Sequence, residues 1–284
     1  MSICFLNGGF VPRSEARISP MDRGFLFGDG VYEVIPVYGR RPFQLAGHIA
    51  RLDKSLAGVR MANPYSAAEW SDLVNRLVEA HPWPDQAIYL QVTRGTDAVR
   101  NHAFPKDVPP TVFMMADPLA PVPDEQMQEG VGAVSTVDNR WLRCDLKTTA
   151  LLANCLLRQL AVEQGCAETV LFRDGFLTEG SASNIFVVKD GVLLAPPKSH
   201  LILPGITYDV VLDLACRHGQ PVEVRDIPEE EVRSADELWL TSSTKEVLPI
   251  TRLDGKPVGS GRPGAVTLKL HGWYQLAKAR GELG

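Results

Sequence analysis

The 284-residue sequence lacks the cysteine patterns that mark disulfide scaffolds and metal sites. It has only five cysteines, an odd number, and none of them forms a Cys-x-x-Cys pair. No group of His and Cys has the spacing of a metal site, so we expect no metal. Unpaired thiols in a reducing compartment are the expected state of Cys4, Cys144, Cys155, Cys166 and Cys216.

Long apolar runs and an excess of basic charge are also lacking. No stretch of about 18 uncharged apolar residues is present, and the N-terminus has no basic start followed by an apolar run. We therefore expect no membrane span, no signal peptide and a cytoplasmic protein. Lys and Arg number 29 against 34 Asp and Glu, a net charge of -5 without a basic block, which argues against nucleic-acid and anionic-membrane partners.

The composition is that of a folded chain of one large or two modest domains, since 45% of the residues are hydrophobic and 22% charged. Three prolines interrupt two strand-like runs in DPLAPVPDE, residues 117–125. Because proline cannot donate to a strand ladder, this segment predicts a boundary. We predict a small N-terminal α/β domain over residues 1–118, a Pro-rich linker over 119–125 and a larger C-terminal domain over 126–284.

Turn signals and hydrophobic spacing predict an α+β fold with largely antiparallel sheets and packed helices. Asn7-Gly8 and two Asp-Gly pairs, at 174–175 and 190–191, each separate two strand-like runs, as in β-hairpins. Three segments have the spacing of helices: one with Ile49, Leu52, Leu56 and Val59, one with Trp70, Leu73, Val74 and Leu77, and residues 149–164. One side of the last helix is apolar and comprises Leu151, Leu152, Cys155, Leu156 and Leu160.

Two ionisable residues stand out as candidates for chemistry. Lys147 lies between a strand-like segment and an apolar helix, where desolvation would favour the neutral amine that Schiff-base formation needs. A solvated lysine near a helix start is the ordinary alternative. Glu179 begins a polar turn, EGSASN, between two apolar strands. It is either an exposed hairpin acid or a fixed anion that faces a cationic ring nitrogen.

Three further segments are candidates for anion binding. PGIT, residues 204–207, precedes a helix, and TSST, residues 241–244, follows a strand; both offer hydroxyl and N–H groups to a phosphate, although Thr207 also suits a helix cap. In the loop TDAVRNHAFP, Arg100 and His102 suit a carboxylate, although one Arg and one His are common in exposed loops. DRGFLFGDGVYE, residues 22–33, matches no nucleotide-binding motif, and its spacing predicts a plain tight turn into a strand.

Seven segments in order resemble the fold-type IV (class IV) pyridoxal-phosphate enzymes, over about residues 5–275. They are DRGFLFGDGVYEV, HIARL, IYLQVTRG, RWLRCDLK, LTEGSASNIF, PGIT and LTSST. The resemblance implies a two-domain enzyme with pyridoxal 5'-phosphate in the cleft between the domains and a larger cofactor-binding C-terminal domain. Within the family the chain looks most like a D-amino acid aminotransferase, because Arg100-Asn101-His102 matches the Arg-x-His motif of those enzymes.

The resemblance also implies roles for individual residues. Lys147 would be the catalytic residue, the Schiff-base lysine that carries the substrate's α-proton. The implied cofactor-binding residues are Arg51, Lys147, Glu179, Ile206, Thr207, Ser242 and Ser243. Tyr32, Arg100 and His102 would bind the substrate carboxylate, the last two reaching in from the other subunit of a homodimer. Arg51 lies off the apolar stripe of its helix, as a solvated residue would.

The implied reaction moves the amino group of a D-amino acid such as D-alanine to a 2-oxo acid such as 2-oxoglutarate. The products would be pyruvate and D-glutamate, by a ping-pong mechanism. A branched-chain L-amino acid aminotransferase and a 4-amino-4-deoxychorismate lyase on the same scaffold are alternatives, and a non-catalytic pyridoxal-phosphate-binding protein is a more distant one. The loop between Gly95 and Arg100 is one residue longer than expected of close relatives, which bears on substrate range.

Overall fold

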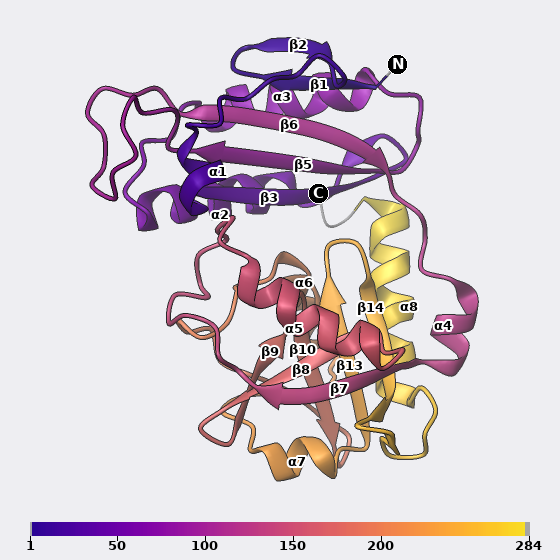
Figure 1. Cartoon of the computed structure of the whole chain (residues 1–284). Helices are drawn as coiled ribbons and strands as arrows, with labels where there is room; N and C mark the ends of the chain where they lie inside the picture. Colours follow the sequence, from indigo (N-terminus) through magenta and orange to yellow (C-terminus); the bar gives the residue numbers. More distant parts are fainter. Residues whose placement is uncertain (1, 282–284) are drawn as a thin grey trace. The chain divides into compact units, whose positions relative to one another are not determined.

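The computed structural model describes residues 2–281, which form two compact units (Figure 1). The first unit holds the described chain up to Ala120 together with Leu146–Leu151, and the second holds Pro121–Asp145 and residues 152–281. The segment that carries Lys147 thus belongs to the first unit, although the chain has already entered the second. Over the described residues, no helix combines the length and apolar character needed to cross a membrane.

The first unit contains one antiparallel sheet with strand order β2-β1-β6-β5-β3-β4. Its strands are β1 (Ile3–Leu6), β2 (Gly9–Pro12), β3 (Gly30–Tyr38), β4 (Arg41–Pro42), β5 (Gln86–Thr93) and β6 (Thr111–Pro118). The hairpin predicted around Asn7-Gly8 is β1–β2. Asn7 adopts φ 47° and Gly8 φ 95°, which is the left-handed backbone that two-residue hairpin turns require.

Helices α2 (Leu45–Gly58) and α3 (Ala67–Glu79) pack their apolar faces against this sheet. Leu52 and Leu56 of α2 and Trp70 and Leu77 of α3 are fully buried, as their spacing predicted. Ser66 begins α3 through a capping box with Glu69.

The predicted tight turn before β3 contains a short helix, α1 (Arg23–Phe27). Asp22 caps its first turn by accepting a hydrogen bond from the Gly24 N–H, and Gly28 ends it with φ 65°. Five residues are too few to produce an apolar stripe, so the sequence spacing did not reveal this helix.

The second unit contains a mixed nine-stranded sheet in which β15 pairs with β14 beside the path β12-β11-β10-β13-β14-β7-β8-β9. Its strands are β7 (Val131–Val137), β8 (Glu168–Arg173), β9 (Phe176–Gly180), β10 (Asn184–Lys189), β11 (Val192–Ala195), β12 (Val222–Val224), β13 (Glu237–Ser242), β14 (Glu246–Leu253) and β15 (Lys256–Pro257). Both predicted Asp-Gly hairpins are present, as β8–β9 and β10–β11. Three pairs are parallel, namely β7–β8, β7–β14 and β11–β12. The α+β class with mainly antiparallel pairing is confirmed.

The helices of the second unit are α4 (Asp124–Glu129), α5 (Leu152–Glu163), α6 (Ile206–Arg217), α7 (Glu229–Arg233) and α8 (Ala265–Arg280). The short helices α4 and α7 both follow a proline and were not expected from the spacing. Helix α5 begins three residues later than predicted. The backbone of Thr149 instead donates to the Gly30 carbonyl, and its hydroxyl donates to the Gly28 carbonyl.

The apolar side of α5 is not its buried side. Leu152, Leu156 and Leu160 are 75%, 62% and 39% exposed, whereas Leu157 and Ala161 pack inward. Helix α5 connects the parallel strands β7 and β8 and packs against both through this narrower face. The leucine stripe is therefore a surface feature of the single chain.

Candidate active site

The first unit brings Lys147 and Tyr32 together. The segment around Lys147 runs alongside β3, because the Tyr32 N–H donates to the Lys147 carbonyl over 3.0 Å and Val31 forms a bridge with Thr148. The Lys147 N–H donates to the Ser55 hydroxyl. The Nζ atom of Lys147 lies 4.2 Å from the centre of the Tyr32 ring, so the amine faces an aromatic surface.

A buried ion cluster occupies the neighbouring position on β3. The Arg51 guanidinium donates to both oxygens of Glu33, from Nε over 2.8 Å and from Nη2 over 2.7 Å, and His48 Nδ1 lies 2.8 Å from Glu33 Oε2. Burial alone would raise the pKa of Glu33, but the charge and hydrogen bonds of Arg51 and the bond to His48 lower it to about 2. Burial lowers the pKa of His48, against the pull of Glu33. Arg51 is thus buried rather than solvated as its spacing indicated.

Arg100 and His102 both contact Phe27 at the end of α1. The Arg100 guanidinium lies 4.8 Å from the centre of the Phe27 ring, and the His102 ring lies 5.2 Å from it. Both residues are exposed and belong to the irregular loop between β5 and β6. The loop and the Tyr32–Lys147 pair lie in the same unit, which holds all three residues expected to bind the substrate carboxylate.

The second unit holds Glu179 in a network of buried groups. Glu179 is 4% exposed; its Oε1 accepts from Arg140 Nη1 over 2.6 Å, and its Oε2 accepts from the Leu203 N–H and from Asn184 Nδ2. Burial raises the pKa of Glu179 to about 7, although Arg140 and the Leu203 N–H act in the opposite direction. Asp138 in turn orients Arg140 through two oxygens. Glu179 is therefore no exposed hairpin acid.

The start of α6 offers donors to an anion. Gly205 precedes the helix without a side-chain cap, and Thr207 is 4% exposed in the first turn. A Cβ at position 205 would lie 2.0 Å from Asn184 Oδ1, so a larger residue there would have to displace the Asn184 side chain. Asn184 pairs across the sheet with Thr241, whose hydroxyl is buried with no hydrogen-bond partner among the described residues. Unused donors and acceptors of this kind fit a phosphate group.

The two serines that follow Thr241 are placed differently. Ser242 ends β13 and accepts a hydrogen bond from the Lys245 N–H, and Ser243 lies half-buried in the turn. Asn184 thus lies next to three parts of the second unit, because it binds Glu179, approaches Gly205 of the PGIT turn and pairs with Thr241 near the end of β13. Arg140 and Asn184 were missed as candidates, although the sequence places Arg140 two residues after Asp138 and Asn184 at the end of the polar turn that Glu179 begins.

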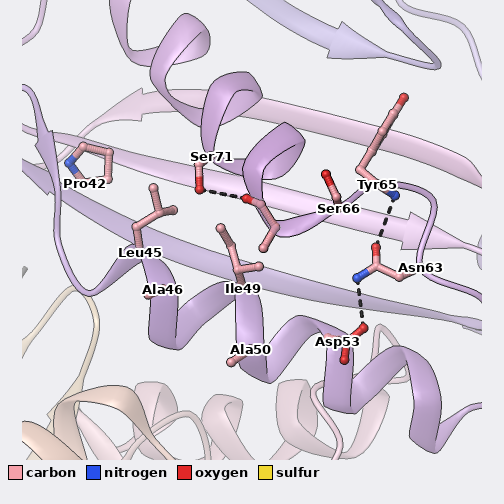
Figure 2. Close-up of a pocket in the computed structure, with 11 residues that line it drawn as sticks. Pro42, Leu45, Ala46, Ile49, Ala50, Asp53, Asn63, Tyr65, Ser66 and Ser71 are labelled. Atoms are coloured by element: carbon pink, nitrogen blue, oxygen red, sulfur yellow. Dashed lines mark hydrogen bonds between the residues drawn. The ribbon is translucent and has the colours of Figure 1, made fainter.

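A pocket of about 660 Å³ lies elsewhere, between α2 and α3 (Figure 2). Its wall is largely apolar, and Asn63 joins Asp53 to the backbone of Tyr65 at one end. None of the predicted site residues lines it. The pocket is therefore separate from the Tyr32–Lys147 pair.

Comparison with known proteins decides the family. A model of the class IV aminotransferases matches residues 30–253. The chain is a class IV aminotransferase. It is 42% identical over 267 residues to a D-alanine aminotransferase of Bacillus licheniformis, covering 94% of this chain and 93% of that one. It is 40% identical over 281 residues to the D-alanine aminotransferase of Listeria monocytogenes serotype 1/2a (strain 10403S), covering 98% and 97%.

Solved structures agree on the fold. The branched-chain amino acid aminotransferase of Escherichia coli matches with a TM-score of 0.89 at 26% identity, covering 95% of this chain and 92% of that one. A second branched-chain enzyme, solved with pyridoxamine 5'-phosphate, matches with a TM-score of 0.90 at 28% identity, covering 97% and 93%.

These comparisons decide several of the predictions. The predicted family, fold type, enzyme class and pyridoxal-phosphate dependence are confirmed. Amino acids and 2-oxo acids are the substrates of such an enzyme. The relatives at 40–42% identity support D-amino acid transamination, whereas the branched-chain enzymes are neighbours in structure at lower identity.

Proposed function

We propose that this aminotransferase transfers the amino group of D-alanine to 2-oxoglutarate, giving pyruvate and D-glutamate in a ping-pong cycle. The observation that carries the proposal is the near-full-length similarity to two D-alanine aminotransferases. The chain adds Arg100 and His102 on one loop, the pair that we expect to bind a substrate carboxylate.

The buried polar groups of the chain fit pyridoxal 5'-phosphate. When bound, the cofactor supplies a cationic ring that accepts electrons from the substrate carbon. We assign its phosphate to Arg51, Ile206, Thr207, Ser242 and Ser243. The donors at the start of α6 suit a phosphate, as does the Thr241 hydroxyl, which has no hydrogen-bond partner within residues 2–281. Buried Glu179 suits a cationic ring nitrogen.

Lys147 is assigned two tasks. Its ε-amino group would hold the cofactor, and when that amine is free it would take the α-proton from the substrate carbon as a general base and then, as an acid, give that proton to the cofactor carbon C4′. Tyr32 borders the amine at 4.2 Å, and its hydroxyl is assigned to the substrate carboxylate together with Arg100 and His102. Because the amine approaches from one side, the position of the carboxylate selects the enantiomer.

We also propose that the enzyme is a cytoplasmic homodimer, with Arg100 and His102 completing the partner's site and no nucleic acid among its partners. The stripe of Leu152, Leu156 and Leu160 supports an interface, since large exposed apolar residues on one helix face favour association. The net charge of -5 argues against nucleic acid.

The test is the visible spectrum of the purified enzyme with D-alanine, L-alanine and L-leucine added separately. We expect D-alanine alone to bleach the band of the bound cofactor and 2-oxoglutarate to restore it. Bleaching by L-leucine would establish the branched-chain alternative, and no bleaching by any of the three would favour the lyase. A protein that stays colourless with added cofactor would contradict the assignment of Lys147.

A further inference from the structure

The side chain of Arg23, in the motif DRGFLFGDG, is almost fully buried beneath the loop that carries Arg100 and His102. It is 3% exposed. Its Nη1 donates to the carbonyls of Asn101 and Ala103, and its Nη2 donates to the carbonyl of His102 over 3.2 Å. Its Nε donates to Asp29 Oδ2 over 2.8 Å. All three nitrogens of the Arg23 guanidinium therefore donate hydrogen bonds. Three of the four bonds go to the carbonyls of three consecutive residues in an exposed loop.

The Arg23 side chain is itself held in place. Asp29 Oδ2 also accepts from Arg94 Nε over 2.9 Å, so one carboxylate lies between two buried arginines. The Arg94 guanidinium lies 3.6 Å from the centre of the Phe104 ring, further along the same loop. The backbone of Arg23 is fixed as well, because its N–H donates to the Gly95 carbonyl at the loop's start.

The Phe27 ring contacts the side chains of Arg23, Arg100 and His102. The guanidinium of Arg23 lies 4.9 Å from the centre of the Phe27 ring, and Arg100 and His102 contact the same ring. The loop has neither helix nor strand between β5 and β6, and Arg100 and His102 are exposed. Without these contacts, ordering a loop of this length would cost conformational entropy each time a substrate binds.

From this geometry we infer that Arg23 is a positioning residue for the substrate carboxylate. It fixes the backbone of residues 101–103, and Phe27 fixes the directions of Arg100 and His102. The inference rests on the proposed function, because it assigns Arg23 to the carboxylate-binding loop. In a dimer with shared sites, Arg23 of one subunit would act on the substrate of the other. Lysine cannot replace it, since a single ammonium cannot span Asp29 and three carbonyls in a fixed plane.

The experiment compares Arg23→Lys with Arg40→Lys in the cofactor-loaded enzyme. Arg40 also donates to two backbone carbonyls, those of Val78 and His81, but away from this loop, and is the matched control. For Arg23→Lys we expect KM for D-alanine to rise about tenfold, the loss expected for hydrogen bonds to a charged group, with kcat nearly unchanged. The dissociation constant of propionate, a carboxylate without an amino group, should rise equally, measured from the cofactor spectrum.

Two further variants separate the possible failures. Arg100→Ala reports whether the loop binds the carboxylate at all: unchanged KM and propionate affinity there would overturn the substrate assignment and this inference with it. If Arg100→Ala binds D-alanine and propionate more weakly while Arg23→Lys binds both as the unsubstituted enzyme does, the inference about Arg23 would be overturned and the substrate assignment would stand. If Arg23→Lys does not fold, Asp29→Asn removes the charge that orients Arg23, and faster amide exchange of residues 96–108 with weaker propionate binding is expected. Protection and affinity equal to the unsubstituted enzyme in Asp29→Asn would overturn the inference.

Discussion

The amine of Lys147 faces the ring of Tyr32 at 4.2 Å, and the Tyr32 N–H binds the carbonyl of the same lysine. The two residues thus contact each other through both their backbones and their side chains, so the Lys147 amine keeps a fixed direction relative to β3. A nucleophile that also carries a proton requires such a fixed approach.

Replacement of Lys147 by alanine should abolish transamination. The variant loses both the group that holds the cofactor and the general base, which together account for at least about a 1,000-fold rate effect. Initial rates of pyruvate formation from D-alanine measure it. Lys54→Ala, an exposed lysine on α2, is the control and should retain full activity. Substantial turnover by Lys147→Ala would show that another residue carries the proton.

Removal of the Tyr32 hydroxyl tests the substrate role separately from the packing role. In Tyr32→Phe the ring facing Lys147 and the ring contact with Tyr89 at 5.7 Å remain. If the hydroxyl binds the substrate carboxylate, KM for D-alanine should rise about tenfold, as for a lost hydrogen bond to a charged group. The unfolding midpoint should stay the same. A drop in that midpoint with unchanged KM would assign Tyr32 to the fold alone.

Arg51→Met should destabilise the cofactor-free protein strongly. It leaves the buried carboxylate of Glu33 without its main partner, which costs about 3–5 kcal/mol. The double variant Glu33→Gln/Arg51→Met should recover much of that loss. Urea unfolding measures both. The exposed Arg76–Asp72 pair is the control, and Arg76→Met should cost less than about 1 kcal/mol. Equal costs for the two arginines would mean that Arg51 contributes only to cofactor binding.

The sequence predicted those parts of the molecule that depend on local patterns. Helices α2, α3 and α6 followed from apolar spacing, and the Asp-Gly hairpins followed from turns that need a left-handed backbone. The late start of α5 did not follow, because bonds from Thr149 to Gly28 and Gly30 compete with the helix. Those partners lie far away in the sequence.

The residues of the candidate site were likewise predicted only in part from the sequence. Motif resemblance singled out Lys147 and Glu179, but Arg140 and Arg23 act through partners 39 and about 80 positions away. Arg51 shows the limit of periodicity, since its position off the apolar stripe is compatible with full burial once Glu33 supplies the opposite charge. Spacing along one helix cannot reveal a partner on a strand.

Glu179→Gln should change how the stability of the cofactor-free enzyme depends on pH. The pKa of Glu179 is raised from 4.5 to about 7, so the folded state holds its proton more tightly than the unfolded chain. Its contribution to stability is present below about pH 4.5 and is lost as pH rises to about 7, by up to about 1.4 kcal/mol per pH unit. The variant should flatten this slope in urea unfolding. Glu163→Gln, an exposed residue of α5, should leave it unchanged.

The same variant should lower turnover in the loaded enzyme. Glutamine lacks the negative charge that we assign to Glu179 opposite the cationic ring nitrogen of the cofactor. We therefore expect kcat to fall by about 100-fold, the cost typical of removing one preorganised electrostatic partner. If Glu179→Gln lowers kcat but leaves the pH dependence of the unfolding free energy unchanged, Glu179 acts on the cofactor and does not contribute to the pH dependence of stability. Full kcat would contradict its role toward the ring.

Leu156→Arg should dissociate the proposed dimer. Leu156 lies at the middle of the exposed stripe of α5 and is 62% exposed, so a charge there costs the single chain little but would be buried unpaired in an interface. The dimer dissociation constant, measured by analytical ultracentrifugation, should rise at least about 100-fold. Leu276→Arg, on the 55% exposed Leu276 of α8, is the matched control and should remain a dimer.

Mixing two impaired variants tests whether the subunits share their sites. If Arg100 reaches the partner's site, a heterodimer of Lys147→Ala and Arg100→Ala has one site in which both residues are intact. Dissociating and reassociating the mixed variants should then restore part of the activity at low D-alanine concentration, which neither variant shows alone. The same mixture carrying Leu156→Arg in both chains should stay inactive, because the sites would not assemble. Activity that stays at the mean of the two separate variants would show that each subunit completes its own site.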